Sequence, residues 1–305
     1  MKIAILSMLS GEFDPYFKDV ERGIAAAKKH FDIDLELHVP DFIGKTERDI
    51  TTWQIRCAEK IAADPSVKAA GVAILNYSRA NEAIGKIVNA GIPTLTFDTD
   101  APDSGRAFYI GTNNRAVGST CAYVMAKLLS FKGRLVIFAP WNNVQSCLER
   151  IVGFREVMQR YNNIEIVREA SSDENEESIR ANAEEVIRIP ELGGVFCVSG
   201  TSARINAQVV RQHGLDGKIK LISVDINQEI INLIRAGTVN MAIAQRPYSM
   251  GFRLMDYLYQ IARNGLPTVM RGIPAGRIVD TGIHQVTQNN LDNFLEIVRR
   301  TEAQS

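Results

Sequence analysis

The sequence has no excess of charge of either sign, because its 35 lysines and arginines equal its 35 aspartates and glutamates. A chain with this balance produces no strong field to attract a polyanion, so nucleic acid is not expected as a partner. The sequence also lacks any apolar run near the roughly 20 residues that a membrane-spanning helix requires, and we expect a soluble protein. Lys2 and the IAILSML that follows are similar to the start of a signal peptide, but GEFDP comes next instead of a small-residue cleavage site.

Cysteine and histidine are scarce, with four of each. The cysteines are Cys57, Cys121, Cys147 and Cys197, and the histidines are His30, His38, His213 and His284. The cysteines are dispersed without a C-x-x-C pair, so the sequence predicts buried free thiols. The histidines show no metal-ligand spacing and are interpreted as surface or hydrogen-bonded residues. We therefore expect neither a metal ion nor a cofactor.

The usual motifs of enzymes built on parallel sheets are missing. No G-x-G-x-x-G follows the first predicted strand, and no G-x-S-x-G elbow occurs. Gly44-Lys45-Thr46 is similar to the end of a phosphate loop, but Val39 stands where the first glycine of that loop is required. We expect a protein without catalytic activity, and a small-molecule enzyme on the same scaffold is an alternative, because a fold does not fix a function.

Short β-branched runs alternate with amphipathic stretches from the first residue onward, which is typical of parallel βαβ units. The first part contains predicted strands at 3–7, 33–39, 72–76 and 94–98, and predicted helices at 16–30, 48–63 and 79–90. The same alternation then begins again, with strands at 135–139, 164–170, 195–199 and 221–225 and helices at 114–130, 145–161, 176–189, 201–213 and 228–235. The predicted fold class is α/β, with two doubly wound parallel-sheet lobes.

The length of 305 residues is about twice that of one usual domain, which also favours two lobes. We expect residues 1–111 and 246–277 in the first lobe and residues 112–245 and 278–305 in the second. No Gly/Ser-rich or Pro-rich linker separates the halves, so short, structured crossings are expected. They are predicted near residues 109–113, 245–247 and 275–281, because 241–245 and 283–287 have strand patterns and 248–263 has a helical one.

Polar residues stand where the predicted strands end. Ligands of open parallel sheets bind beyond the carboxyl ends of the strands, so these residues are candidates for a binding site. They are Ser10 and Asp14, Asp98 and Thr99, Trp141 and Asn142, Ser199, Asp225, and Gln245. Any one of them can be an ordinary loop residue, but together they combine carboxylates, an amide and aromatic residues, with Arg150 in the helix that follows Trp141.

This combination suits a polyol. Each sugar hydroxyl both donates and accepts a hydrogen bond, carboxylates accept, and a guanidinium donates in a planar fork. Aromatic faces can cover the apolar C–H side of a sugar ring. Hydrogen bonds with ionised partners are stronger than neutral ones, which suits an uncharged ligand that must lose its water.

Five segments together resemble periplasmic sugar-binding proteins of the ribose, galactose and xylose type, which share their fold with the effector domains of lactose-repressor-like regulators. The segments are Pro15-Tyr16-Phe17, GIPTLTFDTDAP with YIGTNNRAVG, ERIVGF at 149–154, ISVD ending at Asp225, and MAIAQRP at 241–247. The resemblance covers nearly the whole chain. It implies a type I periplasmic binding protein fold, with three crossings and a ligand cleft between the lobes.

The resemblance also implies roles for individual residues. Asp98 and Arg150 match residues that bind sugar hydroxyls from the two lobes, and Asp225 and Gln245 match residues that complete the contacts. Phe17, beside Tyr16, matches a stacking aromatic residue. Asp14 falls where the ribose-binding protein has a contacting asparagine.

The sequence departs from the family pattern at several of these positions. Thr99 stands where an arginine often follows the aspartate, and Ser199 stands where an asparagine is common. Glu174 aligns near the second stacking aromatic of ribose binders and cannot do that work, so Trp141 is expected to supply the second face. A packed core indole is the alternative for Trp141. The departures argue against ribose itself as the ligand.

The resemblance implies the substrate-binding component of an ABC-type sugar transporter, which captures a monosaccharide or related polyol by closure of the lobes and delivers it to a permease. It further implies a monomer in the periplasm or another extracytoplasmic space, with any signal peptide already removed. The alternative is the ligand-sensing domain of a regulator or receptor. The chain starts on its first strand with no helix-turn-helix before it, which favours the transporter component.

Overall fold

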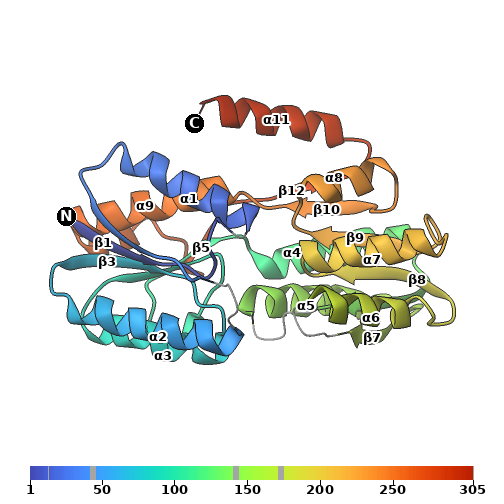
Figure 1. Ribbon diagram of the computed structural model, residues 1–305, viewed down its shortest axis with the longest axis horizontal. Coiled ribbons are helices and arrows are strands. Elements are labelled where there is room, and N and C mark those ends of the chain that lie inside the picture. The colour runs from blue at the N-terminus through green and yellow to red at the C-terminus, as the bar shows by residue number, and fades with distance from the viewer. Residues whose placement is uncertain (13, 42–45, 140–143, 171–174, 305) are drawn as a thin grey trace. The chain divides into compact units, whose positions relative to one another are not determined.

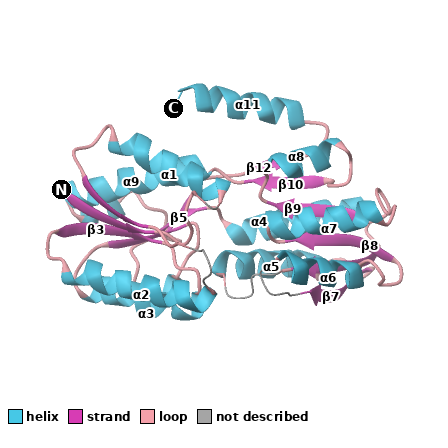
Figure 2. Cartoon of the chain, viewed as in Figure 1, coloured by secondary structure: helices cyan, strands magenta, loops and turns pink. Residues whose placement is uncertain are grey.

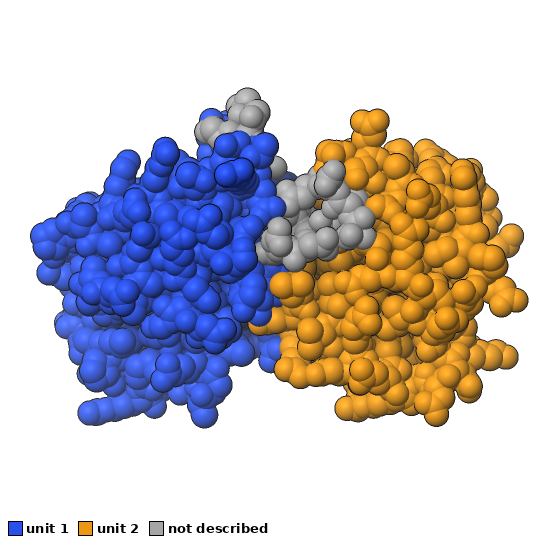
Figure 3. All heavy atoms as spheres, turned by 90° about the horizontal axis from the view of Figure 1, so that it is seen from below, with its two compact units in different colours: residues 1–113, 143–146, 246–282 blue, residues 114–142, 147–245, 283–305 orange. Residues whose placement is uncertain are grey.

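The computed structural model describes residues 1–12, 14–41, 46–139, 144–170 and 175–304, without the side chains of residues 301–304. The chain divides into two compact units, which Figure 3 shows in blue and orange. Unit 1 is Met1–Asn113, Asn143–Ser146 and Arg246–Gly282, and unit 2 is Asn114–Asn142, Cys147–Gln245 and Ile283–Ser305. Apart from the short segment 143–146, the chain therefore passes between the units after residues 113, 245 and 282, whereas the sequence analysis placed these passages after 111, 245 and 277.

Unit 1 is a six-stranded parallel sheet in the order β11-β5-β4-β3-β1-β2. Its strands are β1 (Lys2–Leu6), β2 (Asp34–His38), β3 (Val67–Val72), β4 (Thr94–Phe97), β5 (Tyr109–Gly111) and β11 (Ile278–Asp280). Its helices are α1 (Pro15–Lys28), α2 (Glu47–Ala63), α3 (Tyr77–Asn89), α9 (Pro247–Asn264) and α10 (Leu266–Met270), with a 3-10 turn, η1 (Pro102–Ser104). Helices α1 and α9 lie on one side of the sheet and α2 and α3 on the other (Figure 1).

β11 explains why the last passage falls later than expected. No strand was predicted at this point, but Ile278, Val279 and Asp280 pair with Tyr109, Ile110 and Gly111 of β5. Thr281 continues the pairing by donating its N–H to the carbonyl of Gly111 at 2.9 Å. The segment therefore belongs to the sheet of unit 1 up to Gly282.

The predicted strand at 72–76 was wrong, because β3 lies upstream at Val67–Val72. The strand sequence VKAAGV has small residues, and a side chain at Gly71 would press on Leu254 and Leu258 of α9 at about 3.0–3.2 Å. Residues 73–76 follow the strand as a loop, in which Ala73, Ile74 and Leu75 are buried. The side-chain amide of Gln54, which is fully buried, bonds the carbonyls of Ser7 and Ala73 and the N–H of Leu75. These side-chain bonds replace sheet partners.

Unit 2 repeats the arrangement, with the strand order β12-β10-β9-β8-β6-β7. Its strands are β6 (Gly133–Phe138), β7 (Ile164–Ala170), β8 (Leu192–Cys197), β9 (Lys220–Val224), β10 (Met241–Ala244) and β12 (His284–Val286). Its helices are α4 (Asn114–Leu128), α5 (Gln145–Met158), α6 (Glu176–Val186), α7 (Gly200–Gln212), α8 (Gln228–Arg235) and α11 (Leu291–Gln304). Only the pairing of β12 with β10 is antiparallel among the described strands of this sheet. The predicted α/β class with two doubly wound, mainly parallel sheets is confirmed (Figure 2).

The two faces of the second sheet have separate cores. Side chains of α6, α7 and α8 form one apolar cluster with Val195 and Cys197 of β8. Phe196 points to the other face, where its ring stacks on Phe154 of α5 with centroids 4.4 Å apart. This alternation along β8 places apolar side chains on both faces, as expected for a sheet covered by helices on both sides.

Each unit contains one helix pair in backbone contact through glycines. In unit 1, a Cβ atom at Gly23 of α1 would overlap the carbonyl of Tyr248 of α9, and one at Gly251 would overlap that of Val20. In unit 2, Gly118 of α4 and Gly153 of α5 make the same reciprocal approach. Only glycine allows two helix backbones to come this close.

Candidate ligand-binding site

The candidate residues divide between the two units and are described here one unit at a time. Unit 1 holds Asp14, Tyr16, Phe17, Asp98 and Thr99, and unit 2 holds Arg150, Ser199, Asp225 and Gln245. Trp141 and Glu174 lie outside the described residues. In each unit the described candidates stand at or beyond the carboxyl ends of parallel strands, or in the first turns of the helices that follow.

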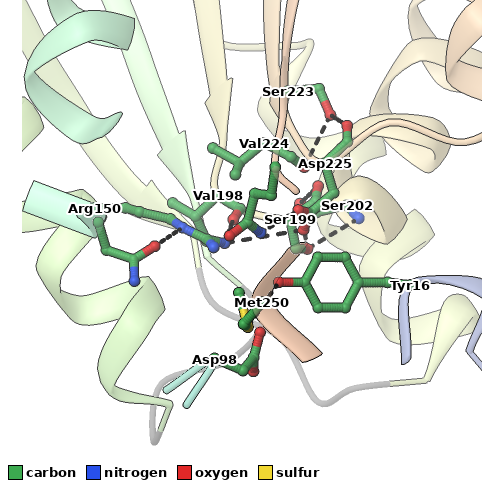
Figure 4. Close-up of polar contacts among 12 residues, drawn as sticks. Tyr16, Asp98, Arg150, Val198, Ser199, Ser202, Ser223, Val224, Asp225 and Met250 are labelled. Atoms are coloured by element: carbon green, nitrogen blue, oxygen red, sulfur yellow. Dashed lines mark hydrogen bonds and ion pairs between the residues drawn. The ribbon is translucent and has the colours of Figure 1, made fainter. Parts of the chain in front are cut away.

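Unit 2 brings three of its candidates together, Arg150, Asp225 and Gln245. The side-chain amide of Gln245 donates to Oδ1 of Asp225 at 2.5 Å, and Nη1 of Arg150 lies 4.0 Å from Oδ2 of the same carboxylate. The Arg150 side chain is 6 % exposed and that of Asp225 is 31 % exposed. The cluster therefore joins a buried cation to a carboxylate that solvent can still reach (Figure 4).

Arg150 is held in place by neutral acceptors. Its Nε donates to Oδ1 of Asn114 and its Nη1 to the carbonyl of Val198, each at 2.8 Å. A buried cation without such bonds would be strongly destabilising, so these acceptors fix the guanidinium as well as solvate it. Asn114 is buried at the start of α4 and was not among the predicted site residues.

The glycine contact between α4 and α5 also positions Arg150. The carbonyl oxygen of Arg150 lies against Gly118, and the carbonyl of Arg115 lies against Gly153. The segments YIGTNNRAVG and ERIVGF thus contain, respectively, Asn114 with Gly118 and Arg150 with Gly153. In each segment the glycine allows the close crossing of α4 and α5, and this crossing fixes where Arg150 lies relative to α4.

Ser199 has a structural role in unit 2. It precedes α7, and its Oγ accepts from the N–H of Ser202 at 3.4 Å and bonds the Ser202 hydroxyl at 3.0 Å, as an N-cap does. A Cβ at the next residue, Gly200, would lie 3.4 Å from Cβ of Asp225. The start of α7 therefore lies beside Asp225, and a ligand-binding role of Ser199 stays a prediction.

Asp14, Tyr16 and Phe17 form the start of α1. Oδ1 of Asp14 caps the helix by accepting from the Tyr16 N–H at 2.8 Å. The Tyr16 hydroxyl lies 4.0 Å from the sulfur of Met250, and the Tyr16 ring meets the Phe17 ring at an angle of 63°. Phe17 is only 2 % exposed and packs as a core residue, so its role as a stacking surface for a sugar also stays a prediction.

Asp98 lies at the end of β4 in a backbone conformation that L residues seldom adopt, with φ of 62°. The N–H of Thr99 donates to the carbonyl of Phe97 at 2.6 Å, which closes a three-residue γ-turn around Asp98. The turn is attached to β5, because the Asp98 N–H bonds the Ile110 carbonyl at 3.3 Å and the Tyr109 hydroxyl bonds the Asp98 carbonyl at 2.8 Å. Asp98 and Thr99 are both buried.

The second acidic residue of this loop, Asp100, has a different environment. Arg106 bonds both of its carboxylate oxygens, and Thr96 and the Ala101 N–H bond its Oδ1. Asp100 and Arg106 are 7 % and 6 % exposed. The carboxylate is saturated by protein donors, so it holds the loop around η1 together, whereas Asp98 stands at the strand end.

One sequence expectation outside the site is confirmed. All four cysteines are buried free thiols. Burial raises the pKa of the Cys121 thiol and that of the Cys197 thiol well above the usual range of cysteine, so both thiols stay protonated near neutral pH. Among the residues described, no three His, Cys, Asp or Glu side chains are grouped so that they could hold a metal ion. None of the helices in the described ranges is long and apolar enough to cross a bilayer.

Two solved structures of similar fold are described as binding sugars. An ABC transporter solute-binding protein from Burkholderia graminis, in complex with D-arabinose, is 24% identical and superposes with a TM-score of 0.82 over 95% of this chain and 96% of that chain. A glucose-galactose binding protein from Geobacillus stearothermophilus is 24% identical, with a TM-score of 0.84 over 95% of this chain and 98% of that chain. Both likenesses concern the fold.

A curated relative and a family description agree with this likeness. The D-allose-binding periplasmic protein of Escherichia coli K12 is 22% identical over 277 residues, which are 88% of this chain and 87% of that protein. The family described as "Periplasmic binding protein domain" matches residues 5–266, which is most of the chain. The protein therefore belongs to the periplasmic binding protein domain family.

Proposed function

We propose that the protein is the substrate-binding component of an ABC-type sugar transporter and that it binds a monosaccharide or a related polyol. Asp98 and Thr99 of unit 1 and Arg150, Asp225 and Gln245 of unit 2 contact the sugar in this proposal. Asp14, Tyr16, Phe17, Trp141 and Ser199 are further contacts expected from the sequence. The protein supplies binding, and the permease supplies transport.

The cluster of Arg150, Asp225 and Gln245 carries this proposal. The guanidinium and amide donate, the carboxylate accepts, and the carboxylate is partly exposed. A sugar hydroxyl can donate to the carboxylate and accept from a neighbouring N–H at the same time. Because Asn114 and Val198 already orient the Arg150 guanidinium, binding does not have to order this group first.

The relatives support a monosaccharide as the ligand class. The proteins named above are described as binders of D-allose, D-arabinose, and glucose and galactose. A further structural neighbour, from Agrobacterium vitis, is described with bound α-D-tagatopyranose. These sugars differ in carbon number and stereochemistry, so the proposal specifies the class and leaves the choice among them to measurement.

The proposed partners follow from the same family. We infer an ABC permease as the receiving partner and an extracytoplasmic location, where a periplasmic binding protein collects its ligand. The protein is proposed to act as a monomer. In this scheme a sugar held by residues of both units favours a closed arrangement, because a ligand shifts an equilibrium toward the state that it binds better.

The experiment is a thermal-shift survey of D-allose, D-arabinose, D-tagatose, D-galactose, D-glucose and D-ribose, with myo-inositol as a cyclic polyol. A ligand that binds only the folded state stabilises it by RT ln(1 + [L]/Kd), so the melting temperature rises as the ligand concentration exceeds Kd. We expect at least one sugar to do so, and titration calorimetry then gives its affinity. A melting temperature unchanged by all of these compounds at millimolar concentration contradicts the proposal.

Closure has its own test. Solution X-ray scattering with the best sugar of the survey is expected to show a smaller radius of gyration at saturation than without sugar. If the two curves are identical while calorimetry records binding, the sugar binds without closure, and the delivery scheme has to be abandoned.

A further inference from the structure

Both strand-end aspartates of the proposed site have a left-handed backbone. The φ angle is 62° at Asp98 and 74° at Asp225. Aspartate adopts this region more readily than most residues, but the conformation still has to be held by its surroundings. Each aspartate also keeps its place in the sheet, because its N–H bonds the next strand, at Ile110 for Asp98 and at Ile243 for Asp225.

A buried hydroxyl accompanies each of these backbones. The Tyr109 hydroxyl donates to the carbonyl of Asp98 at 2.8 Å, and the Ser223 hydroxyl lies 3.0 Å from the carbonyl of Asp225 (Figure 4 shows the Ser223 contact). Tyr109 is 2 % exposed and Ser223 is fully buried. A peptide carbonyl turned by a positive φ loses its ordinary partner, so a buried donor at this point stabilises the turned state.

The contact at Tyr109 requires a glycine two residues later. A Cβ atom at Gly111 would overlap the Tyr109 hydroxyl, so only a glycine leaves room for the ring to reach back over β5. The same hydroxyl lies 3.2 Å from the carbonyl of Thr112, next to the end of this segment of unit 1. Tyr109 thus connects the turn of Asp98 with the residues that lead out of the unit.

The hydroxyls of Tyr109 and Ser223 come from different positions in the sheet, but each contacts the backbone carbonyl of its aspartate. Ser223 lies on the strand that its aspartate follows, two residues earlier, and its hydroxyl also lies 3.1 Å from the carbonyl of Val224. Tyr109 lies on the neighbouring strand, opposite Thr96 of β4. In both units the donor acts on the main chain of the aspartate, which leaves its carboxylate to other partners.

We propose that Tyr109 and Ser223 are positioning residues, which hold Asp98 and Asp225 in the left-handed conformation that aims each carboxylate at the sugar. This role rests on the proposed function, since it assigns the two hydroxyls to the same binding site. Neither residue touches the sugar in this proposal. Removing either hydroxyl lets the corresponding aspartate relax toward an ordinary extended backbone and misdirects its side chain.

The test uses Tyr109→Phe and Ser223→Ala in the full chain, with Tyr257→Phe as the control. Tyr257 lies in α9 of the same unit as Tyr109, its ring meets Phe108 with centroids 5.2 Å apart, and its hydroxyl has no hydrogen-bond partner among the described residues. Each variant is titrated calorimetrically with whichever sugar of the survey binds the wild type most tightly. Ligand-free crystal structures of the variants report the φ angles of Asp98 and Asp225.

We expect each positioning variant to bind about tenfold more weakly, which is the effect of losing one well-placed hydrogen bond, while Tyr257→Phe binds as the wild type does. We also expect Asp98 to have a negative φ in Tyr109→Phe, and Asp225 in Ser223→Ala. Wild-type affinity in both variants, or an aspartate that keeps its positive φ without the hydroxyl, overturns the positioning role. If the wild type binds no sugar, the proposed function fails, and the φ angles of the variants still decide whether the hydroxyls hold the turns.

Discussion

The backbone carbonyl of Arg150 lies against Gly118, at a distance where no side chain fits between α4 and α5. Gly118→Ala is therefore expected to push the helices apart and to lower the free energy of unfolding by about 1–3 kcal/mol, the usual effect of overpacking. Urea unfolding measures the loss. The control is Gly85→Ala in α3, where nothing lies within 4 Å of the added Cβ. Alanine there should stabilise the helix by up to about 1 kcal/mol. Equal stability of Gly118→Ala and wild type would contradict the close contact.

Arg150 and Asp225 should dominate sugar affinity in unit 2. Truncation of either to alanine removes a charge-assisted hydrogen bond, which is worth about 1.5–3 kcal/mol in binding. Asp98→Ala is expected to have a loss of similar size. Calorimetry with the best sugar gives these values, and circular dichroism checks that each variant is folded. Arg155→Ala is the matched control, because Arg155 lies on the same helix but pairs with Glu169 at the surface. The site assignment is wrong if all three variants bind like Arg155→Ala.

Removing one partner of the buried ion pair between Asp100 and Arg106 should destabilise the protein far more than breaking an exposed pair does. Asp100→Asn leaves the buried guanidinium without its charge partner, for which we expect a loss of about 3–5 kcal/mol in urea unfolding. Arg79→Ala breaks an exposed pair with Glu82 and should change stability by less than about 0.5 kcal/mol. A small loss in Asp100→Asn would mean that the loop around η1 does not depend on this pair.

The amino group of Lys2 should make the stability of unit 1 depend on pH. Nζ of Lys2 lies 2.7 Å from both Asp64 and Glu36. These bonds lower the pKa of both carboxyls and raise that of Lys2. The carboxyl contribution is present above the unfolded carboxyl pKa values of about 4 and is lost as pH falls through the lowered folded values. The lysine contribution is complete below about pH 10 and is lost as pH rises through the raised folded value.

Lys2→Gln should therefore melt at a lower temperature than wild type between about pH 5 and pH 10, and this difference should shrink as the pH falls below about 4. Melting curves from pH 2 to pH 10 measure it. Lys68→Gln, at an exposed position of β3, is the control and should show no such pH dependence. A Lys2→Gln difference that stays constant down to pH 2 would exclude these carboxyls as its cause.

The strands that the sequence predicts well include buried runs with β-branched residues, such as β4 and β9, whose observed bounds differ by one residue at most from the predicted ones. The sequence failed at β3 because small residues there make room for α9, and that requirement comes from tertiary packing. It failed at β11 because three residues carry little pattern and their pairing with β5 is a long-range contact. The antiparallel pairing of β12 is likewise decided by where the chain returns.

For the site, the sequence pattern located the ends of β4, β9 and β10, and with them Asp98, Asp225 and Gln245. It could not reveal that Asn114 solvates Arg150 or that Tyr109 bonds the carbonyl of Asp98. Such contacts depend on the depth at which two elements pack and on backbone angles, which residue spacing does not encode. The only hint in the sequence of the contact between Asn114 and Arg150 was the pair Asn113-Asn114 at the start of a predicted helix.

The packing of α9 against α1 also bears on how the protein is made. Unit 1 takes its last helices and its edge strand from residues 246–282, which are synthesised after nearly all of unit 2. Until then the face of β3 that meets Leu254 and Leu258 has no cover, and Gly23 and Val20 of α1 have no partner helix. A nascent chain that has emerged only as far as β10 therefore contains every strand of the unit 2 sheet except β12, whereas unit 1 still lacks α9, α10 and β11. We therefore expect unit 2 to complete its fold first, although most of unit 1 leaves the ribosome before it.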